Sequence, residues 1–491
     1  MAPRHNSPAL DSTPPMRIRL APRVRRTLRA FLAAAAMTGC GAQAAPPALA
    51  IVDVALIDGV SETVRAHQTV IVRDGKVVEV GPASETEVPR GTRRIDGRGR
   101  WLMPGLWDMH VHAFAYDFAD FSGPLMLAWG VTGARDMGFY VDTARFWRGE
   151  VAAQRVEGPR MVVGGRLDGP VNRAPWVARA ATDAEARHAV DSLVEAGADF
   201  IKVYSSLNRA AYFAAADQAR RRGIVIAGHV PHSVSTLEAI RAGQLSIEHE
   251  DDLMRACSRE DATLRRELST KPAGAPPSAE LAMIRDHGRR MRTGYDAPRC
   301  TAVLAEMARA GTRLTPTLIV YQPYLARTDT AVMHPTALPW VPPTLQAVWR
   351  TRLNRATPRD SAVVAAFFSL ARTGEAHRLG VRLMAGSDAP LAYVYPGLSL
   401  HDELVLLVRA GLTPMQAIRA ATYEPAAYLG ALDSLGTIRP GRAADLVLLD
   451  RDPLADIRNT RSISAVITRG RVVDRAALLR RVARASSGQA R

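Results

Sequence analysis

Cysteine is scarce in this sequence, and so is lysine. Three cysteines in 491 residues are too few for a disulfide framework. Beyond residue 40 only Cys257 and Cys300 remain. After export to an oxidising compartment these two can pair, and two buried free thiols are the alternative. We predict that Cys257 and Cys300 form a disulfide.

Long apolar segments and basic runs interleaved with aromatic residues are also lacking. No stretch beyond residue 40 is long and apolar enough for a membrane helix. The formal charge of +16 first suggests nucleic acid, but residues 1–40 hold seven arginines and one aspartate, so +6 of it lies there. The remaining charge is spread without basic runs. We therefore expect a small-molecule substrate and no nucleic-acid partner.

The first 44 residues resemble an export leader. Six arginines between residues 17 and 29 precede a short apolar core at 31–37. Met37-Thr-Gly-Cys40 resembles a bacterial lipoprotein cleavage box, which makes Cys40 the lipidated N-terminus, whereas Ala42-Gln-Ala44 offers an ordinary signal-peptidase site instead. We expect an exported, periplasmic protein, anchored to the outer membrane through lipid if Cys40 is used.

The rest of the chain is long enough for a large barrel and an accessory domain. Short β-runs occur at both ends, and Asp74-Gly75 between two of them predicts a hairpin. Neither end is large enough to close a sandwich alone, so we predict one small β-sandwich domain built from residues 45–103 and 426–480. Residues 481–491 are expected to form a disordered tail.

Between these segments, residues 104–425 alternate β-runs with amphipathic, alanine- and arginine-rich helical patterns. Eight such units have the size of a TIM barrel. The predicted fold class is therefore α/β, a (β/α)8 barrel with the small β-sandwich domain. The longest departure from the pattern, 251–312, contains both cysteines and a proline-rich loop, and we predict that it forms a lid over the barrel mouth.

Potential metal ligands fall at the ends of predicted strands, where the active sites of such barrels lie. His110 and His112 are spaced i, i+2, which in a strand places both imidazoles on one face, a common seat for a zinc-type cation. Four further strand ends carry such residues. The complete set is His110, His112, Lys202, His229, His249 and Asp388.

The order HxH, Lys, His, His, Asp resembles the amidohydrolase superfamily, in its binuclear-metal branch with a carboxylated lysine. Residues 102–105 and 436–447 add to the likeness, and within the superfamily the chain is similar to the imidazolonepropionase-related and Xaa-Pro-type dipeptidase cluster. The resemblance implies two divalent metal ions bridged by a hydroxide and by a CO2-derived carbamate on Lys202 (N6-carboxylysine). It assigns one ion to His110, His112 and Asp388. The other ion falls to His229 and His249.

The chemistry is consistent with these residues. Two cations about 3.5–4 Å apart lower the pKa of a bridging water and polarise a carbonyl. Asp388 can take the proton during attack and deliver it to the leaving nitrogen. A histidine-rich set with a carboxylate-type bridge favours zinc, with manganese and cobalt as alternatives.

Lys202 stands out on its own. Of 64 basic side chains only three are lysine, and Lys76 and Lys271 lie in a hairpin turn and a polar loop. Lys202 lies inside an apolar strand, where burial is costly unless its charge is paired or removed. Arginine stays protonated, whereas a desolvated lysine can become a carbamate. The alternative is a lysine paired with a carboxylate.

Other polar residues have weaker patterns. We predict substrate contacts for Tyr204, on the same strand face as Lys202, and for His232, on a loop at the barrel mouth. His401 is expected to cap or orient a helix, and Asp108 to orient His110. The remaining histidines have no strand-end context and are interpreted as surface or structural: His67, His188, His287, His334 and His377.

The leading hypothesis is a metal-dependent hydrolase of C–N bonds, either a dipeptidase or an N-acyl amino-acid amidohydrolase. Residues 228–233 lack the His-Ala-Tyr motif of the dipeptidase relatives, which leaves a non-peptide substrate open. One alternative is a mononuclear cyclic-amide hydrolase or deaminase similar to imidazolonepropionase, which lacks the bridging lysine. The other is a non-catalytic, lipid-anchored binding protein. A homo-oligomer is compatible with the sequence.

Overall fold

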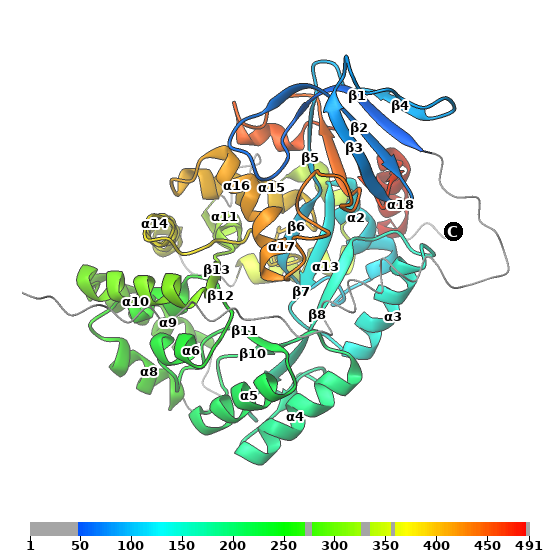
Figure 1. The fold of residues 1–491 in the computed structure, drawn as a ribbon. Helices are drawn as coiled ribbons and strands as arrows, with labels where there is room; N and C mark the ends of the chain where they lie inside the picture. Colours follow the sequence, from blue (N-terminus) through cyan, green and yellow to red (C-terminus); the bar gives the residue numbers. More distant parts are fainter. Residues whose placement is uncertain (1–47, 271–276, 326–333, 355–358, 488–491) are drawn as a thin grey trace, which may run out of the picture.

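The structure, a computed structural model, describes residues 48–270, 277–325, 334–354 and 359–487 (Figure 1). The predicted leader, with Cys40, lies outside the described residues, as does Lys271. Among the helices that are described, none has the length and apolar character needed to cross a membrane.

Parallel strands form the centre of the molecule and confirm the barrel. Seven of them are hydrogen-bonded in chain order, each parallel to the next. The eighth predicted strand is not continuous, but isolated parallel bridges, Leu314–Leu383 and Val111–Ala389, place that segment between the first and last strands. The seven are β6 (Leu106–Val111), β7 (Val131–Asp136), β8 (Arg160–Asp168), β10 (Phe200–Val203), β11 (Val225–Gly228), β12 (Ser246–Glu248) and β13 (Arg313–Thr315).

The barrel strands are covered by helices on the outside, so their residues are buried on both faces. Every residue of β6 and β7 is buried, as expected for a parallel sheet. Helix α4 (Asp183–Ala196) begins with a capping box between Thr182 and Glu185. Helices α3 (Val141–Ala152), α4 and α5 (Arg209–Arg221) follow one another along the flank (Figure 1).

Both ends of the chain contribute to a second sheet, as predicted. Its strands are joined in the order β16-β15-β14-β5-β1-β2-β3, with β4 beside β1, as one hydrogen-bonded sheet. Antiparallel pairing of β5 with β14 joins the two ends, and the β2–β3 hairpin turns at Asp74-Gly75. The strands are β1 (Leu49–Leu56), β2 (Arg65–Arg73), β3 (Lys76–Pro82), β4 (Arg93–Asp96), β5 (Trp101–Pro104), β14 (Leu446–Leu449), β15 (Ile463–Thr468) and β16 (Arg471–Val472).

The expected disordered tail is wrong for residues 481–486. Helix α18 (Arg475–Ser486) continues through them, capped by Asp474, which accepts a hydrogen bond from the backbone N–H of Ala477. Leu478 and Val482, spaced i, i+4, are buried in apolar clusters with α2 (Gly123–Ala128). Together with Leu479, which packs against the same clusters, these residues anchor an arginine-rich helix whose composition resembles a tail.

The described residues of the segment 251–312 form four helices: α7 (Asp251–Ala256), α8 (Asp261–Ser269), α9 (Pro277–Thr293) and α10 (Ala297–Ala310). Helix α10 packs against α6 (Thr236–Arg241) and leads into β13, so it belongs to the barrel wall. A βα unit needs such a helix to return the chain to the sheet. The lid stays a prediction for α8 and α9.

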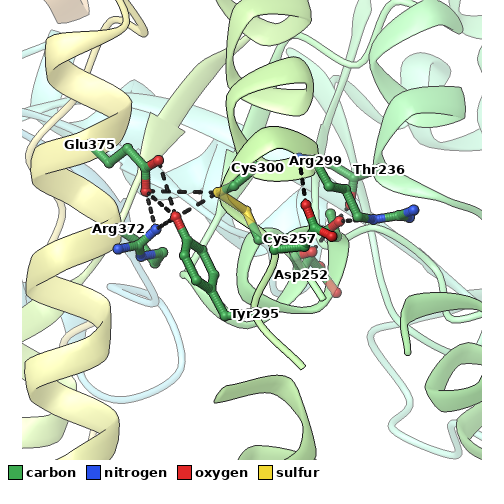
Figure 2. Close-up of a disulfide and its surroundings, with 10 residues drawn as sticks. Thr236, Asp252, Cys257, Tyr295, Arg299, Cys300, Arg372 and Glu375 are labelled. Carbon is green, nitrogen blue, oxygen red and sulfur yellow. Dashed lines mark hydrogen bonds and ion pairs between the residues drawn. A yellow bond between two sulfur atoms is a disulfide. The ribbon is translucent and has the colours of Figure 1, made fainter. Parts of the chain in front are cut away.

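A disulfide joins Cys257, directly after α7, to Cys300 on α10 (Figure 2). Both cysteines are fully buried. Beside the bond, Tyr295 donates to the carboxylate of Glu375 at 3.0 Å, and Arg372 pairs with the same carboxylate. The bridge therefore fixes the segment that follows His249 to the helix that precedes β13.

We expect the double variant Cys257→Ser, Cys300→Ser to be less stable by about 4 kcal/mol, because a loop of 43 residues is no longer closed in the unfolded chain. Chemical denaturation should show an earlier midpoint. A reducing agent should lower the midpoint of the parent protein and leave that of the variant unchanged. A non-reduced peptide map without a linked Cys257–Cys300 peptide would contradict the bridge.

Candidate metal centre

Four imidazoles and one carboxylate meet at the C-terminal ends of the barrel strands. His110 Nε2 and His112 Nε2 lie 3.4 and 3.3 Å from Asp388 Oδ1, and His249 Nε2 lies 3.9 Å from Asp388 Oδ2. Ligand atoms of His110, His112 and Asp388 all fall within 4.8 Å of one another. The His229 ring is 5.0 Å from that of His249, centroid to centroid. The structure thus brings these predicted ligands together.

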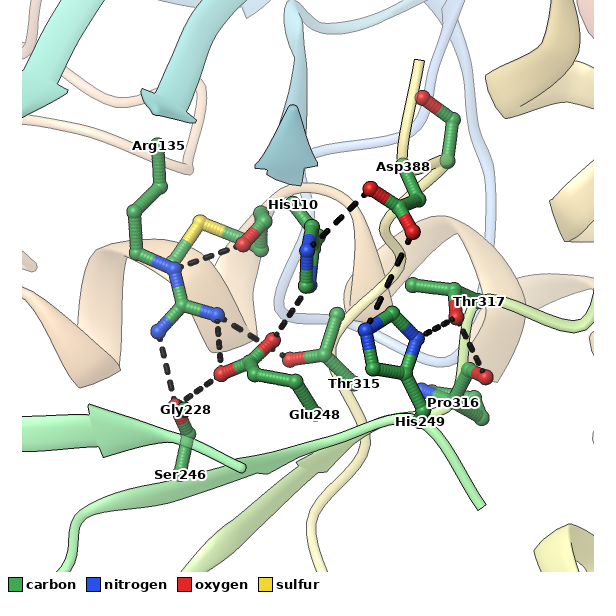
Figure 3. A network of polar contacts seen from close by, with 12 residues as sticks. His110, Arg135, Gly228, Ser246, Glu248, His249, Thr315, Pro316, Thr317 and Asp388 are labelled. Atoms are coloured by element: carbon green, nitrogen blue, oxygen red, sulfur yellow. Dashed lines mark hydrogen bonds and ion pairs between the residues drawn. The ribbon is translucent and has the colours of Figure 1, made fainter. Parts of the chain in front are cut away.

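The outer nitrogens of three of these rings are held by oxygen atoms, and Figure 3 shows this for His110 and His249. His110 Nδ1 lies 2.9 Å from Glu248 Oε2, and His249 Nδ1 lies 2.7 Å from Thr317 Oγ1. His229 Nδ1 lies 3.2 Å from Ser205 Oγ. An imidazole that donates from Nδ1 keeps a lone pair on Nε2, and here Nε2 of His110 and His249 faces the centre.

Burial favours the neutral imidazoles of His110 and His229. Desolvation holds the pKa of His110 and of His229 well below the ordinary value, and neighbouring positive charges act in the same direction. Neutral imidazole is the form that binds a cation.

Glu248 and Arg135 were missed by reasoning from the sequence. Arg135 is fully buried and donates from Nη2 to Glu248 Oε1 at 2.7 Å and from Nη1 to Ser246 Oγ at 2.8 Å (Figure 3). Glu248 in turn holds His110. The signal was present, since each is a charged residue inside an apolar strand, where it requires a partner.

Asp108 does not hold the His110 ring, contrary to expectation. It accepts hydrogen bonds from the backbone N–H of His110 at 3.2 Å and from that of Ser387 at 2.9 Å. Burial raises its pKa to about 7. Asp108 therefore ties β6 to the segment that carries Asp388.

Lys202 is fully buried, and within the described residues its Nζ has no hydrogen-bond partner. Desolvation lowers the pKa of Lys202 to about 7. The stem crosses Gly228, where a Cβ would lie 2.8 Å from Lys202 Cδ and 2.4 Å from Val203 O. Asp388 Oδ1 is a second buried polar atom without a hydrogen bond there. Together with the four imidazoles, these two atoms form a set of potential metal ligands that fits divalent cations.

Backbone strain also occurs at the candidate metal centre. His249, Thr317 and Asp388 have φ values of 68°, 49° and 59°, in the left-handed region. For residues other than glycine this costs about 1–3 kcal/mol each and is concentrated at functional sites. In this structure it turns the chain so that these three side chains face the centre.

The two predicted substrate contacts lie at the rim. Tyr204 stacks on His229 with ring centroids 4.7 Å apart, and burial raises its pKa to about 12, so its hydroxyl remains a donor. His232 is three residues beyond His229, and its backbone N–H donates to Ser205 O at 2.9 Å.

His401 lies away from the centre. Its ring nitrogens contact Thr460 Oγ1 and Trp129 O, each at 3.0 Å, which orients α15 (Leu398–Arg409) against its neighbours. Both nitrogens are therefore engaged in structural contacts.

Glu248→Gln is expected to weaken metal binding about 10- to 100-fold, because the amide no longer offers His110 a full carboxylate and leaves Arg135 with a buried, unpaired charge. Competition with a chromophoric chelator measures the affinity. Glu79→Gln, an exposed change on β3, is the matched control. Unchanged affinity in Glu248→Gln would show that Glu248 does not set the His110 tautomer.

A parallel barrel with four histidines, a lysine and an aspartate at its C-terminal rim is the framework of a metal-dependent hydrolase. The sequence profile of the amidohydrolase family matches residues 101–317 and 365–473. The chain belongs to this family.

Individual relatives agree with the family. Over 45 residues the chain is 53% identical to dihydroorotase of Anaeromyxobacter sp. (strain K), and over 39 residues it is 56% identical to imidazolonepropionase of Stenotrophomonas maltophilia (strain R551-3). These matches cover 9% and 8% of this chain, and the chain spans about a tenth of the length of each relative.

Solved structures resemble the whole fold. The bottromycin amidohydrolase has a TM-score of 0.70 at 24% identity, over 90% of this chain and 91% of that one. A Xaa-Pro dipeptidase with methionine in its active site has a TM-score of 0.62 at 20% identity, over 87% and 99%. At these identities the likeness concerns the fold.

Proposed function

We propose that the protein is a binuclear metal-dependent hydrolase of amide-type C–N bonds, either a dipeptidase or an N-acyl amino-acid amidohydrolase. The observation that carries the proposal is Lys202. Its amine is buried among the histidines and Asp388 without a hydrogen-bond partner in the described chain. A carbamate on this nitrogen would be a carboxylate-type bridge in a site that is otherwise rich in imidazole.

In this proposal His110, His112 and Asp388 would hold one ion, His229 and His249 would hold the other, and Lys202, as its carbamate, would be a ligand to both. Zinc suits this set. When bound, the ions supply a water of lowered pKa and polarise the substrate carbonyl.

Asp388 moves the proton. Burial alone would raise its pKa, but His110, His112 and His249 hold the pKa below its ordinary value, so the carboxylate is ionised at neutral pH. It can accept a proton during attack and return it to the leaving nitrogen. The hydroxyl of Tyr204 is a neutral donor at the rim for the substrate carbonyl.

A mononuclear cyclic-amide hydrolase is the second candidate, favoured by the short match to imidazolonepropionase. The two differ in metal content, with two ions per chain in one case and one in the other. A non-catalytic binding protein would hold a ligand without turnover.

The test combines metal analysis with a substrate screen. Elemental analysis of the purified protein should find two ions per chain. The loaded enzyme should hydrolyse members of a panel of dipeptides and N-acyl amino acids in preference to cyclic amides and lactones. One ion per chain with ring opening of cyclic amides would support the second candidate, and absence of turnover on all classes would overturn both.

We also propose export, with a lipid anchor at Cys40. The support is the Met-Thr-Gly-Cys box after a basic, short apolar segment. Mass spectrometry of the mature N-terminus from the membrane fraction should find lipidated Cys40, and an unmodified N-terminus at Ala45 would contradict it.

A further inference from the structure

Arg166 lies beside the proposed metal centre. It is near the end of β8, and its Nε donates to Met137 O at 3.2 Å. Its Nη2 lies 2.9 Å from His112 Nδ1, and its guanidinium lies 4.8 Å from the centroid of the Tyr204 ring. Arg166 is half-buried, so part of its side chain remains accessible.

Arg166 has no carboxylate partner within ion-pair distance among the described residues. Three other arginines of the barrel do have one. The Arg135–Glu248, Arg148–Asp199 and Arg160–Asp445 pairs have N–O distances of 2.7, 2.6 and 2.6 Å. A positive charge held near the centre without such a partner is a binding position for an anion.

The acidic residues near Arg166 accept hydrogen bonds from backbone N–H groups. Asp136 Oδ1 accepts from the backbone N–H of Gly138 at 2.8 Å. Asp168 Oδ1 accepts from the backbone N–H groups of Gly169 and Ser206 at 2.8 and 2.9 Å. These two carboxylates therefore shape the loops, and neither forms an ion pair with Arg166, although burial raises the pKa of Asp136 and the Arg166 charge lowers it at longer range.

A cation on His112 Nε2 would place the proton of the neutral ring on Nδ1. A guanidinium has only donors, so Nδ1–H and Arg166 would then face each other as two donors. Arg166 Nη2 would in that case need another acceptor.

We propose that Arg166 binds a carboxylate on the substrate, placed α to the nitrogen of the scissile amide. This rests on the proposed function and names the residue that recognises the α-carboxylate shared by N-acyl α-amino acids and dipeptides. In such molecules only three bonds, of about 1.33, 1.46 and 1.52 Å, separate the carbonyl carbon from the carboxylate carbon. The group that recognises the carboxylate must then lie next to a metal-binding imidazole, where Arg166 lies, and its planar fork matches a carboxylate in two parallel hydrogen bonds.

The first test compares N-acetyl-L-alanine with its carboxamide. In Arg166→Gln the ratio of kcat/KM for the acid to that for the amide should fall about 10- to 100-fold relative to the parent enzyme, as expected for a lost hydrogen bond to a charged group. The ratio is read within each enzyme, so a general loss of activity cancels. Arg173→Gln removes an exposed arginine from the loop after the same strand and should keep the parent ratio. An unchanged ratio in Arg166→Gln overturns the proposal.

The second test measures binding without turnover. Calorimetry on the metal-loaded protein should find that N-methylsulfonyl-L-alanine, which has no amide to hydrolyse, binds more tightly than its carboxamide. Arg166→Gln should remove this difference and keep its metal ions. A variant that loses the ions would overturn the proposal, because Arg166 would then support His112.

The two tests separate the two proposals. Hydrolysis with an unchanged ratio leaves the function standing and removes the role of Arg166. Carboxylate binding that depends on Arg166, without hydrolysis of any amide, would support the role of Arg166 and contradict the proposed hydrolase function.

Discussion

Lys202→Arg is expected to abolish loading of the two metal ions, although it keeps a positive charge and a similar length. Lys202 Nζ lies in a fully buried position, where desolvation lowers its pKa to about 7. At neutral pH part of the amine is uncharged, and that form adds CO2 through a new N–C bond and releases a proton. A guanidinium stays protonated, cannot form the carbamate, and repels cations from the histidines.

Lys202→Ala should behave differently. It leaves a gap into which acetate or formate can fit as a replacement for the carbamate. We expect Lys202→Ala to lose most activity and to regain part of it when a small carboxylate is added. Lys202→Arg should regain none. Elemental analysis and initial rates with and without carboxylate measure both effects. If Lys202 were an ion-pair partner, arginine would be the milder change, so an active Lys202→Arg enzyme with two ions would contradict the mechanism.

The barrel and the convergence of the candidate ligands at one rim were predictable because their signals are local. Alternation of apolar runs with helical patterns marks the strands, and in a parallel barrel the strand ends meet at one rim. His229 and His249 directly follow β11 and β12. The eighth strand was harder, since the segment before Asp388 pairs only through isolated bridges.

Pairings between distant residues were not predictable in the same way. Arg135 and Glu248 are 113 residues apart, and nothing local shows that one holds the other. Arg166 was overlooked because arginine is so common in this chain that one more carries no signal; its lack of an acidic partner appears only in three dimensions. The second half of helix α18, residues 481–486, was taken for a tail because Val482 is its one apolar residue in a core cluster.

Asp388→Asn is expected to lower kcat about 100- to 10,000-fold, the contribution of a positioned general base and acid. The amide has nearly the same shape, tolerates the left-handed backbone at φ 59°, and leaves the backbone bond from Asp388 N to His110 O at 2.7 Å in place. It cannot accept a proton. The loss should therefore appear in kcat beyond what weaker metal binding explains, so rates are compared at saturating metal.

The pH dependence of kcat gives a second measurement of the role of Asp388. Burial raises the pKa of Asp388, but the surrounding histidines hold it below its ordinary value, so the carboxylate is in its base form at neutral pH. Between pH 5 and 8 the carboxylate should contribute no acid limb to kcat in the parent enzyme. Asp142→Asn, an exposed change on α3, should keep the parent kcat. An Asp388→Asn enzyme with parent kcat would move the proton transfer to another residue at the rim, because no amide side chain can take up the proton.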